Sequence, residues 1–288
     1  MRLCFALSAM LLLVHAAGAA EPNRPKASDT LKPPQKHASS SPITDRFALR
    51  VLMWPTSLTT DLRLDSQTNR IGTQLIAEDD LGLPDTKMEG RAEMIIRLRE
   101  RNRLRVDYLK LSRFGNQVLT RQINFGNQTF NINDRAQTQL EWRDLTFTYT
   151  RSLIYTPRFE VGLGLGISIL EARARGEVTA RNIREAQEAV GAFPTLGLDG
   201  TWRISKRWAF TARAQKFNAS VDEFNGSIGD YHADIQYRWR ENFALGIGYT
   251  RFHSLVDVGQ DDNGANDDLT GRFDQEMRGP EIFLRASF

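Results

Sequence analysis

The feature that most constrains this 288-residue chain is a period of two in its hydrophobicity. From Arg46 onward, apolar and polar residues alternate in segments of about ten, which polar stretches separate. Residues 231–240 show the pattern best, because Tyr231, Ala233, Ile235, Tyr237 and Trp239 alternate with His232, Asp234, Gln236, Arg238 and Arg240. Successive side chains of a β-strand point to opposite faces, so each segment is predicted to be a strand with one apolar face.

The pattern predicts ten strands, with eight or twelve as alternatives. They lie at roughly 46–64, 87–99, 103–115, 136–152, 159–174, 191–204, 207–219, 229–240, 243–257 and 276–288. Four connections are short (99–102, 153–158, 205–207 and 240–242), whereas the connections at 65–86, 116–135, 175–190, 220–228 and 258–275 are mostly longer and polar. Short turns at one end and long loops at the other predict an all-β fold, an antiparallel up-and-down transmembrane β-barrel.

The N-terminus predicts export. Arg2, the apolar run 5–14 and the small residues 17–20 have the order of a cleaved signal peptide, which we place at residues 1–20. Residues 21–44 are rich in proline and polar residues and are expected to form a disordered leader, so the barrel is assigned to residues 45–288. Cys4 is the only cysteine and would leave with the signal, which excludes disulfides and thiolate chemistry in the mature chain.

Composition and motifs exclude several function classes. The formal net charge is only +3 and no long basic run stands out, so nucleic acid is not expected as a partner. No phosphate-binding glycine loop, HExxH motif or nucleophile elbow is present, and no cofactor or metal is predicted. The acidic run Asp261–Asp268 offers oxygen ligands for a divalent cation, but it lacks EF-hand spacing, and a solvated loop is the favoured interpretation.

Alternation alone does not tell which face points inward, since a soluble lipocalin-like barrel has the same period. Gly162, Gly164 and Gly166 share a face with Glu160, as expected of a crowded interior that must hold long charged side chains. We therefore assign the polar face to the lumen. Fourteen charged residues are expected there: Arg50, Arg97, Arg99, Arg105, Asp107, Glu141, Glu160, Asp199, Arg203, Arg213, Asp234, Arg238, Glu281 and Arg285.

These lumen charges allow two interpretations. They could form a selective constriction for small solutes, or they could interlock as a salt-bridged plug in a narrow barrel. We favour the plug. A barrel-embedded hydrolase is a weaker alternative, with His232 and Asp234 on the lumen face and Asp79 and Asp80 on a loop that could approach them.

Three local irregularities are also predicted. The outward parity of the apolar residues slips between Met53 and Leu58 around Pro55, and again between Trp142 and Leu145, so each place is expected to hold a bulge. Within 178–190, apolar residues at helix-like spacing predict a short helix in a loop.

The final strand carries a resemblance. Residues 279–288 read GPEIFLRASF, in which Ile282, Leu284, Ala286 and Phe288 alternate with polar or bulky residues up to a terminal phenylalanine. This resembles the last strand of Gram-negative outer-membrane barrels, and the sequence DDLGLP at 79–84 resembles uncharacterised proteobacterial barrels of that kind. The resemblance implies that this strand is the signal for the barrel-assembly machinery, and that the protein resides in the outer membrane in contact with lipid and lipopolysaccharide.

The sequence thus predicts a non-enzymatic outer-membrane barrel that acts through its extracellular loops or in envelope integrity. A small-solute channel or porin is the first alternative, and an omptin-like or lipid A-modifying hydrolase is the second. The sequence does not identify an extracellular ligand.

Overall fold

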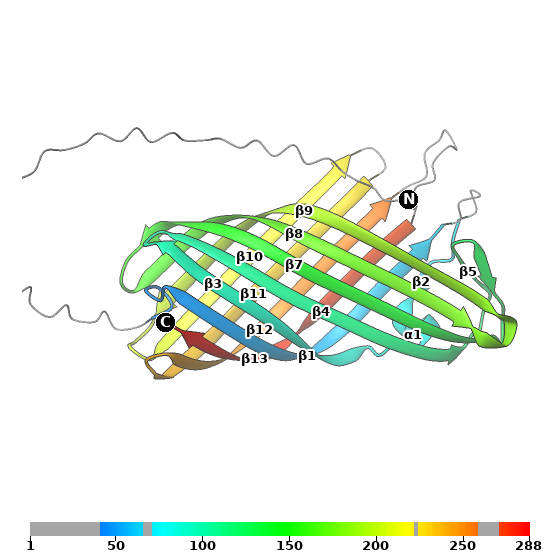
Figure 1. Cartoon of the computed structure of the whole chain (residues 1–288), viewed down its shortest axis with the longest axis horizontal. Coiled ribbons are helices and arrows are strands. Elements are labelled where there is room, and N and C mark those ends of the chain that lie inside the picture. The colour runs from blue at the N-terminus through cyan, green and yellow to red at the C-terminus, as the bar shows by residue number, and fades with distance from the viewer. Residues whose placement is uncertain (1–40, 66–70, 222–223, 259–270) are drawn as a thin grey trace, which may run out of the picture. The chain divides into compact units, whose positions relative to one another are not determined.

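The computed structural model describes residues 41–65, 71–221, 224–258 and 271–288. Ten long antiparallel strands form a closed barrel, in which β13 returns to pair with β1 (Figure 1). They are β1 (Phe47–Leu64), β3 (Thr86–Arg99), β4 (Asn102–Val118), β7 (Arg135–Tyr155), β8 (Phe159–Val178), β9 (Ile183–Arg203), β10 (Trp208–Val221), β11 (Phe224–Arg240), β12 (Phe243–Val258) and β13 (Gly271–Ser287). The predicted antiparallel barrel of ten strands is confirmed.

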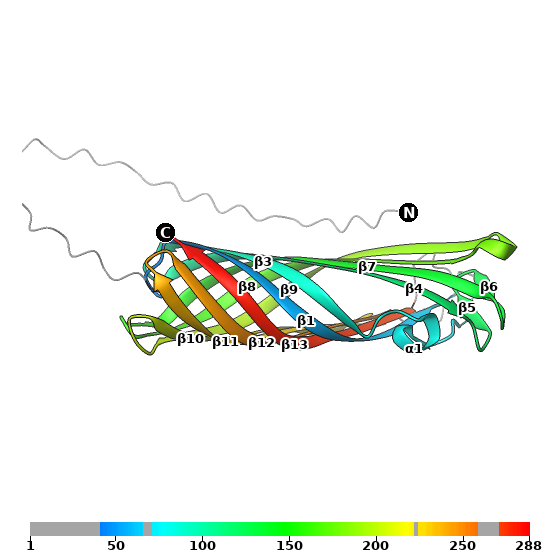
Figure 2. The same cartoon turned by 90° about the horizontal axis from the view of Figure 1, so that it is seen from below.

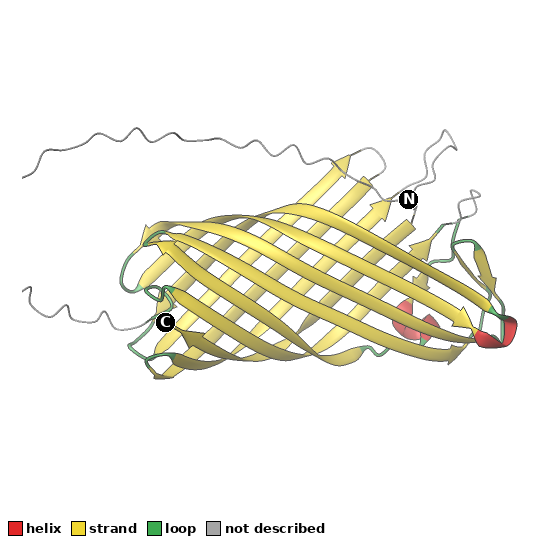
Figure 3. Ribbon diagram, in the orientation of Figure 1, coloured by secondary structure: helices red, strands yellow, loops and turns green. Residues whose placement is uncertain are grey.

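The two ends of the barrel differ. Tight turns join β3 to β4, β7 to β8, β9 to β10 and β11 to β12 at one end, which we call the turn end. The other end, the loop end, carries β2 (Leu75–Ile76), α1 (Ala77–Leu81), the hairpin of β5 (Ile123–Phe125) and β6 (Gln128–Phe130), and the 3-10 helix η1 (Thr179–Arg181). Figure 2 shows α1, β5 and β6 gathered at the end away from the C-terminus, and Figure 3 shows how little helix accompanies the strands. Among the described residues, no helix is long and apolar enough to cross a membrane.

The short helix predicted within 178–190 is wrong. β8 and β9 continue as one hairpin to the pair Val178↔Ile183, where η1 and Asn182, with a φ of 53°, turn the chain. In this extension Arg184, Ala186, Glu188 and Val190 are exposed on the outward face, whereas Glu185 and Gln187 on the inward face are half-buried. Neither face of this extension is continuously apolar, so its sequence loses the period of two.

The two predicted bulges are also wrong. β1 alternates between inward and outward side chains without interruption from Ala48 to Leu64, and its register with β3 does not shift. β7 likewise alternates through Trp142 and Leu145 in constant register with β4. The inward-facing residues simply change from polar to apolar partway along each strand.

This change follows a rule that holds on several strands. On β12, the outward Tyr249 and inward Thr250 are followed by the outward Arg251 and inward Phe252. β7 changes in the same way, from outward Leu145 and inward Asp144 to outward Arg143 and inward Trp142. Toward the turn end the barrel is apolar outside and charged inside, and toward the loop end these polarities exchange. We call this exchange the polarity inversion.

Part of the expected leader belongs to the barrel. Residues 1–40, which include the predicted signal peptide, lie outside the described residues. Ser41 to Thr44 form a hydrogen-bonded turn, and Ile43 is fully buried. Arg97 donates a hydrogen bond to the carbonyl of Pro42, so this turn is held against the turn end of the barrel wall.

Candidate functional site

The interior near the turn end is filled by charged side chains that pair with one another. Eight arginines form ion pairs there with eight carboxylates. This charge plug comprises Arg50, Arg91, Arg97, Arg103, Arg105, Arg213, Arg238 and Arg285 with Asp45, Glu93, Asp107, Glu160, Asp199, Asp230, Asp234 and Glu281. Equal numbers of opposite charges leave the paired set formally neutral.

The pairs span the barrel and do not merely follow one strand. The guanidinium of Arg97 on β3 meets Glu160 on β8 through two hydrogen bonds of 2.9 Å each. Arg91 on β3 reaches Asp230 on β11 at 2.6 Å, and Arg213 on β10 reaches Glu93 on β3 at 2.7 Å. Forked arginine–carboxylate geometry fixes such contacts in direction as well as in distance.

Arg50 on β1 occupies the centre of one part of the plug. Its guanidinium lies 3.2 Å from Asp234, 3.3 Å from Glu281 and 3.1 Å from Nε2 of His232, and it stacks 3.8 Å from the ring centroid of Phe283. The same Nε2 of His232 lies 2.7 Å from Asp234, and Nδ1 on the other side of the ring lies 2.9 Å from the hydroxyl of Thr250.

His232, Asp234 and Glu281 have the spacing of metal ligands, since one ligand atom of each lies within 4.8 Å of the others. They are the one such group in the part of the chain that the structure describes. However, the guanidinium of Arg50 lies within hydrogen-bonding distance of all three residues. A cation is thus already tethered where a metal ion would bind, and these residues do not fit a metal while Arg50 is in place.

The structure does not bring Asp79 and Asp80 to His232. His232 contacts Arg50 on β1, whereas α1 contacts Thr60 on the same strand, through a hydrogen bond from the Thr60 amide to Glu78. Ten strand residues separate these points, or roughly 33 Å at about 3.3 Å per residue. Asp80 instead pairs with Arg121 at 2.6 Å and raises the pKa of that guanidinium through their hydrogen bond. A relay that joins the aspartates to His232 is therefore not assembled.

Beyond the charge plug the interior becomes apolar. The apolar layer consists of Trp54, Leu58, Leu109, Leu111, Trp142, Leu170, Phe193, Ile228, Phe252 and Met277, all buried. Trp142 and Phe252 pack edge to face with centroids 4.9 Å apart, and Trp54 has no exposed surface. Eight barrel strands contribute to this layer, so it crosses the lumen from wall to wall.

A second apolar cluster closes the loop end. Leu75, Ala77, Leu81 and Leu83 from the first long loop and Leu119, Ile123 and Phe130 from the second pack against Leu62, Ala136, Leu140 and Val178 of the barrel wall. We call the two loops the loop cap. Arg113, which is buried beneath it, binds both Glu78 and Thr60.

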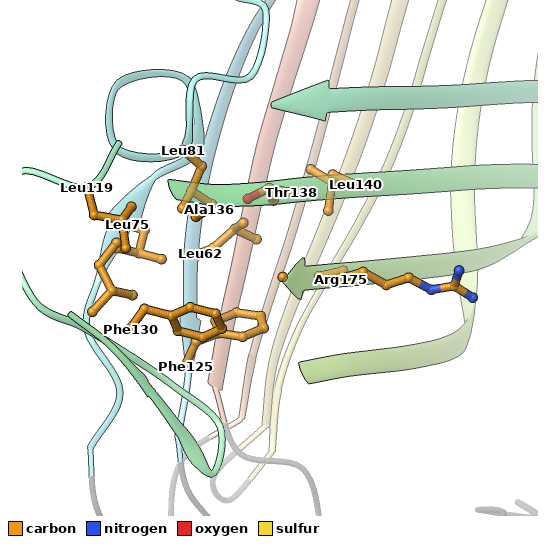
Figure 4. A pocket seen from close by; sticks show the side chains of 13 residues that line it. Leu62, Leu75, Leu81, Leu119, Phe125, Phe130, Ala136, Thr138, Leu140 and Arg175 are labelled. Carbon is orange, nitrogen blue, oxygen red and sulfur yellow. The ribbon is translucent and has the colours of Figure 1, made fainter. Parts of the chain in front are cut away.

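The cavity beneath the loop cap is too small for a ligand. Its volume is about 30 Å³, and its lining includes Leu62, Leu75, Phe125, Phe130 and Leu140 (Figure 4). An apolar cavity needs roughly 150 Å³ to hold a molecule the size of benzene. The space is therefore a packing gap of the loop cap.

Eleven of the fourteen residues that the sequence assigned to the lumen lie in the charge plug. Arg203 is half-buried on the inward face of β9, beyond Thr201. Two placements differ from expectation. Arg99 is exposed at the turn between β3 and β4, and Glu141 lies on the outward face of β7, where it pairs with Arg143. For Glu141 the reason is the assumed bulge, because without a parity slip Trp142 faces inward and Glu141 must face outward.

Sequence reasoning missed five members of the charge plug: Asp45, Arg91, Glu93, Arg103 and Asp230. Arg91 and Glu93 have the same parity on β3 as Arg97, and Asp230 has the same parity on β11 as His232. Extending the parity of each strand over its full length would have found these three. Asp45 precedes the first strand, where no period exists.

The residues of the expected assembly signal lie on the outward face of β13 and, for Phe288, directly after that strand. Ile282, Leu284 and Phe288 are exposed, and Ala286 is half-buried. Their strand forms the closing seam with β1, with pairs from Ala48↔Ser287 to Leu64↔Gly271. The acidic run Asp261–Asp268 lies outside the described residues.

Comparisons with solved structures support the fold. The chain is similar to the outer-membrane protease OmpT from Escherichia coli, with a TM-score of 0.50 and 13% identity over 84% of this chain and 96% of that one. Lower similarity extends to the transport unit of the autotransporter AIDA-I from Escherichia coli (TM-score 0.38, 8% identity, 90% of this chain and 93% of that one) and to Ail, the attachment invasion locus protein of Yersinia pestis (TM-score 0.35, 8% identity, 83% and 99%). No family and no curated protein matches the sequence. At these identities the likeness concerns the fold, which is that of an outer-membrane β-barrel.

Proposed function

We propose that this outer-membrane-type barrel is an integral protein of the outer membrane that neither conducts nor catalyses through its lumen, and that it acts at its loop end or in envelope integrity. The observation that carries the proposal is the filled interior. The charge plug, the apolar layer and the loop cap follow one another along the barrel, as Arg50, Trp54, Leu58 and Leu62 do along β1.

The outer surface supports insertion in a membrane. On β8 the outward residues from Phe159 to Ile169 are apolar, and they are followed by the outward Glu171. Eleven strand residues at a tilt near 40° span roughly 25 Å, the height of the apolar band of an outer-membrane barrel. Outward aromatic residues mark both edges of this band, with Trp202, Trp208, Trp239 and Phe243 near the turn end and Tyr108, Tyr231 and Tyr249 near the polarity inversion.

The charge plug argues against a channel. A conducting pore needs a continuous aqueous path, whereas these side chains are buried and engaged with one another. Removing one partner of a buried pair leaves an uncompensated charge and costs about 3–5 kcal/mol, so thermal opening of the plug is unfavourable. The apolar layer adds a second, dry barrier.

Planar-bilayer recording tests the absence of conduction. Purified protein reconstituted at a protein-to-lipid ratio at which a porin gives discrete openings is expected to give none. Discrete, reproducible openings that scale with protein concentration would overturn the proposal. Fractionation and gel mobility with and without boiling test the location, because an inserted barrel sediments with outer membranes and shifts only on heating.

A hydrolase is tested separately. Wild-type protein and the His232→Ala and Asp80→Asn variants are assayed on peptide and lipid A substrates. We expect no activity that either substitution removes, because His232 is buried under Arg50 and Asp80 is bound to Arg121 at the loop end. Activity that is present in the wild type and absent from one variant would contradict this part of the proposal.

A further inference from the structure

β9 has an unpaired edge above the barrel wall. Its ladder with β10 stops at Leu196↔Lys216, whereas its ladder with β8 continues to Val178↔Ile183. Residues 183–195 thus pair with β8 on one side and, among the described residues, with no strand on the other. In Figure 1, β9 and β10 diverge toward the loop end.

The direction of each amide along this edge can be derived. The amide of Arg203 donates to the carbonyl of Arg158, which leads into β8, so odd-numbered residues of β9 face β8. The register with β8 is constant over the whole strand, and even-numbered residues therefore face the open side. Pro194 is one of these and lacks an N–H, as expected where a ladder ends. The amides on the open side that have no strand partner among the described residues are those of Arg184, Ala186, Glu188, Val190 and Ala192.

Among the described residues no strand pairs with this edge, and the side chains beside it on the outward face are exposed. The side chains of Arg184 and Glu188 are 73% and 51% exposed, and Val190 is 66% exposed. An exposed row of unpaired N–H and C=O groups is a template for another strand. Natural barrels avoid such edges by closing, and this one closes only as far as Leu196.

The edge is complementary to itself. In an antiparallel pairing of two copies, Ala186 lies opposite Ala186 of the partner subunit. Arg184 then lies opposite Glu188 of the partner subunit, and Glu188 lies opposite Arg184 of the partner subunit. All three pairs use even-numbered residues, so each is a hydrogen-bonded pair, and together they supply about six backbone hydrogen bonds. Opposite charges placed directly across two strands stabilise the pairing.

We propose that the β9 edge binds the same edge of a second copy of this chain, antiparallel and in the register Ala186 opposite Ala186. The inference rests on the proposed function in one respect, namely that the loop end is the acting end. Antiparallel pairing reverses the strand direction, so the turn ends of the two barrels point away from each other. The contact therefore joins barrels that are embedded in two facing membranes.

A single cysteine tests the register. In a Cys4→Ser background, Ala186→Cys is expected to form a disulfide-linked dimer on mild oxidation, because opposing Cα atoms in a hydrogen-bonded pair lie about 5.5 Å apart, within disulfide range. Ala192→Cys is the matched control, since it lies on the same edge with the same parity but is displaced from its counterpart by many residues. Equal cross-linking of both variants, or of neither, would overturn the register.

A charge exchange tests the partner. Arg184→Glu and Glu188→Arg should each reduce the cross-link at position 186 several-fold, and the double variant should restore it. Within one chain the exchange cannot help, because Glu177 and Arg173 on β8, which now pair with Arg184 and Glu188, would repel the exchanged side chains. Rescue by the double variant therefore reports contact between copies, and failure of rescue would refute it.

Vesicles test the orientation. Proteoliposomes that carry the protein with its loop end outward should cluster, as followed by light scattering, and the Arg184→Glu variant should abolish clustering. Cross-linking without clustering would overturn the arrangement between facing membranes. Bilayer conductance is an independent measurement. Absence of cross-linking and clustering would refute the pairing without refuting the non-conducting barrel, and discrete channel openings would refute the non-conducting barrel without refuting the pairing.

Discussion

Replacing Arg50 by alanine tests whether the charge plug is held together by tethered cations. Arg50 contacts Asp234, Glu281 and His232 directly and lies 3.8 Å from Glu93. Its side chain is 4% exposed, and those of the three carboxylates are at most 1% exposed. Arg50→Ala therefore leaves several buried carboxylates with fewer opposing charges and no access to water.

The expected loss in the free energy of unfolding is at least about 3–5 kcal/mol, the cost of breaking one buried ion pair by removing a partner. Because Arg50 forms ion pairs with more than one carboxylate, we expect a loss at the upper end of that range. Arg50→Lys keeps the charge but not the forked geometry, so it should lose roughly half as much.

Equilibrium unfolding by guanidinium in phospholipid vesicles, followed by tryptophan fluorescence, measures these differences. Arg278→Ala is the matched control, because Arg278 is 61% exposed on the outward face of β13 and makes one long ion pair of 3.9 Å with Glu276. It should change stability by no more than about 0.5 kcal/mol. A loss below about 1 kcal/mol for Arg50→Ala would refute the argument that the plug is a set of obligatory pairs.

Three further outcomes follow from the interior. Trp54→Ala should lose about 3–5 kcal/mol in the same assay by opening a cavity in the apolar layer, whereas Trp239→Ala, on the outward face, should lose less. Micromolar Zn²⁺ should raise the unfolding midpoint of Arg50→Ala and leave the wild type unchanged, because only the variant frees the three residues with metal-ligand spacing. Gly279→Ala should destabilise the closing seam by roughly 1–3 kcal/mol, since its Cβ would lie 2.2 Å from the carbonyl oxygen of Pro55, whereas Gly90→Ala meets only Leu52 at 3.9 Å and should be tolerated.

The strand count and closure were predictable from sequence because lipid imposes a period of two on one face of every strand. On β12, for example, Phe243, Leu245, Ile247 and Tyr249 face outward, and their spacing alone defines the strand. The terminal strand was predictable for the same reason. The extension of β8 and β9 was not, because neither of its faces is continuously apolar, and apolar residues at helix-like spacing within 178–190 predicted a short helix instead.

The content of the interior was only partly predictable. Parity tells which side of the wall a residue occupies, so most of the charge plug was found. It does not tell which partner stands across the lumen, and the pair of Arg97 with Glu160 joins positions 63 residues apart. The apolar layer was not predicted, because the two supposed bulges placed Leu58 and Trp142, which face inward, on the outward face.

The polarity inversion is the single cause of the two wrongly predicted bulges, one in β1 and one in β7. Below it the barrel obeys the rules of a membrane protein, with lipid outside and charges inside, and above it the same strands obey the rules of a soluble barrel, with water outside and an apolar core inside. A strand that crosses from one solvent to the other must exchange the polarity of its two faces while its geometry stays unchanged. On the sequence this exchange is indistinguishable from a shift of one residue, which is what a bulge produces. The positions in β1 and β7 where slips were predicted, near Pro55 and between Trp142 and Leu145, therefore mark the level at which the proposed membrane-embedded part of the barrel ends, and the β9 edge lies on the aqueous side of that level.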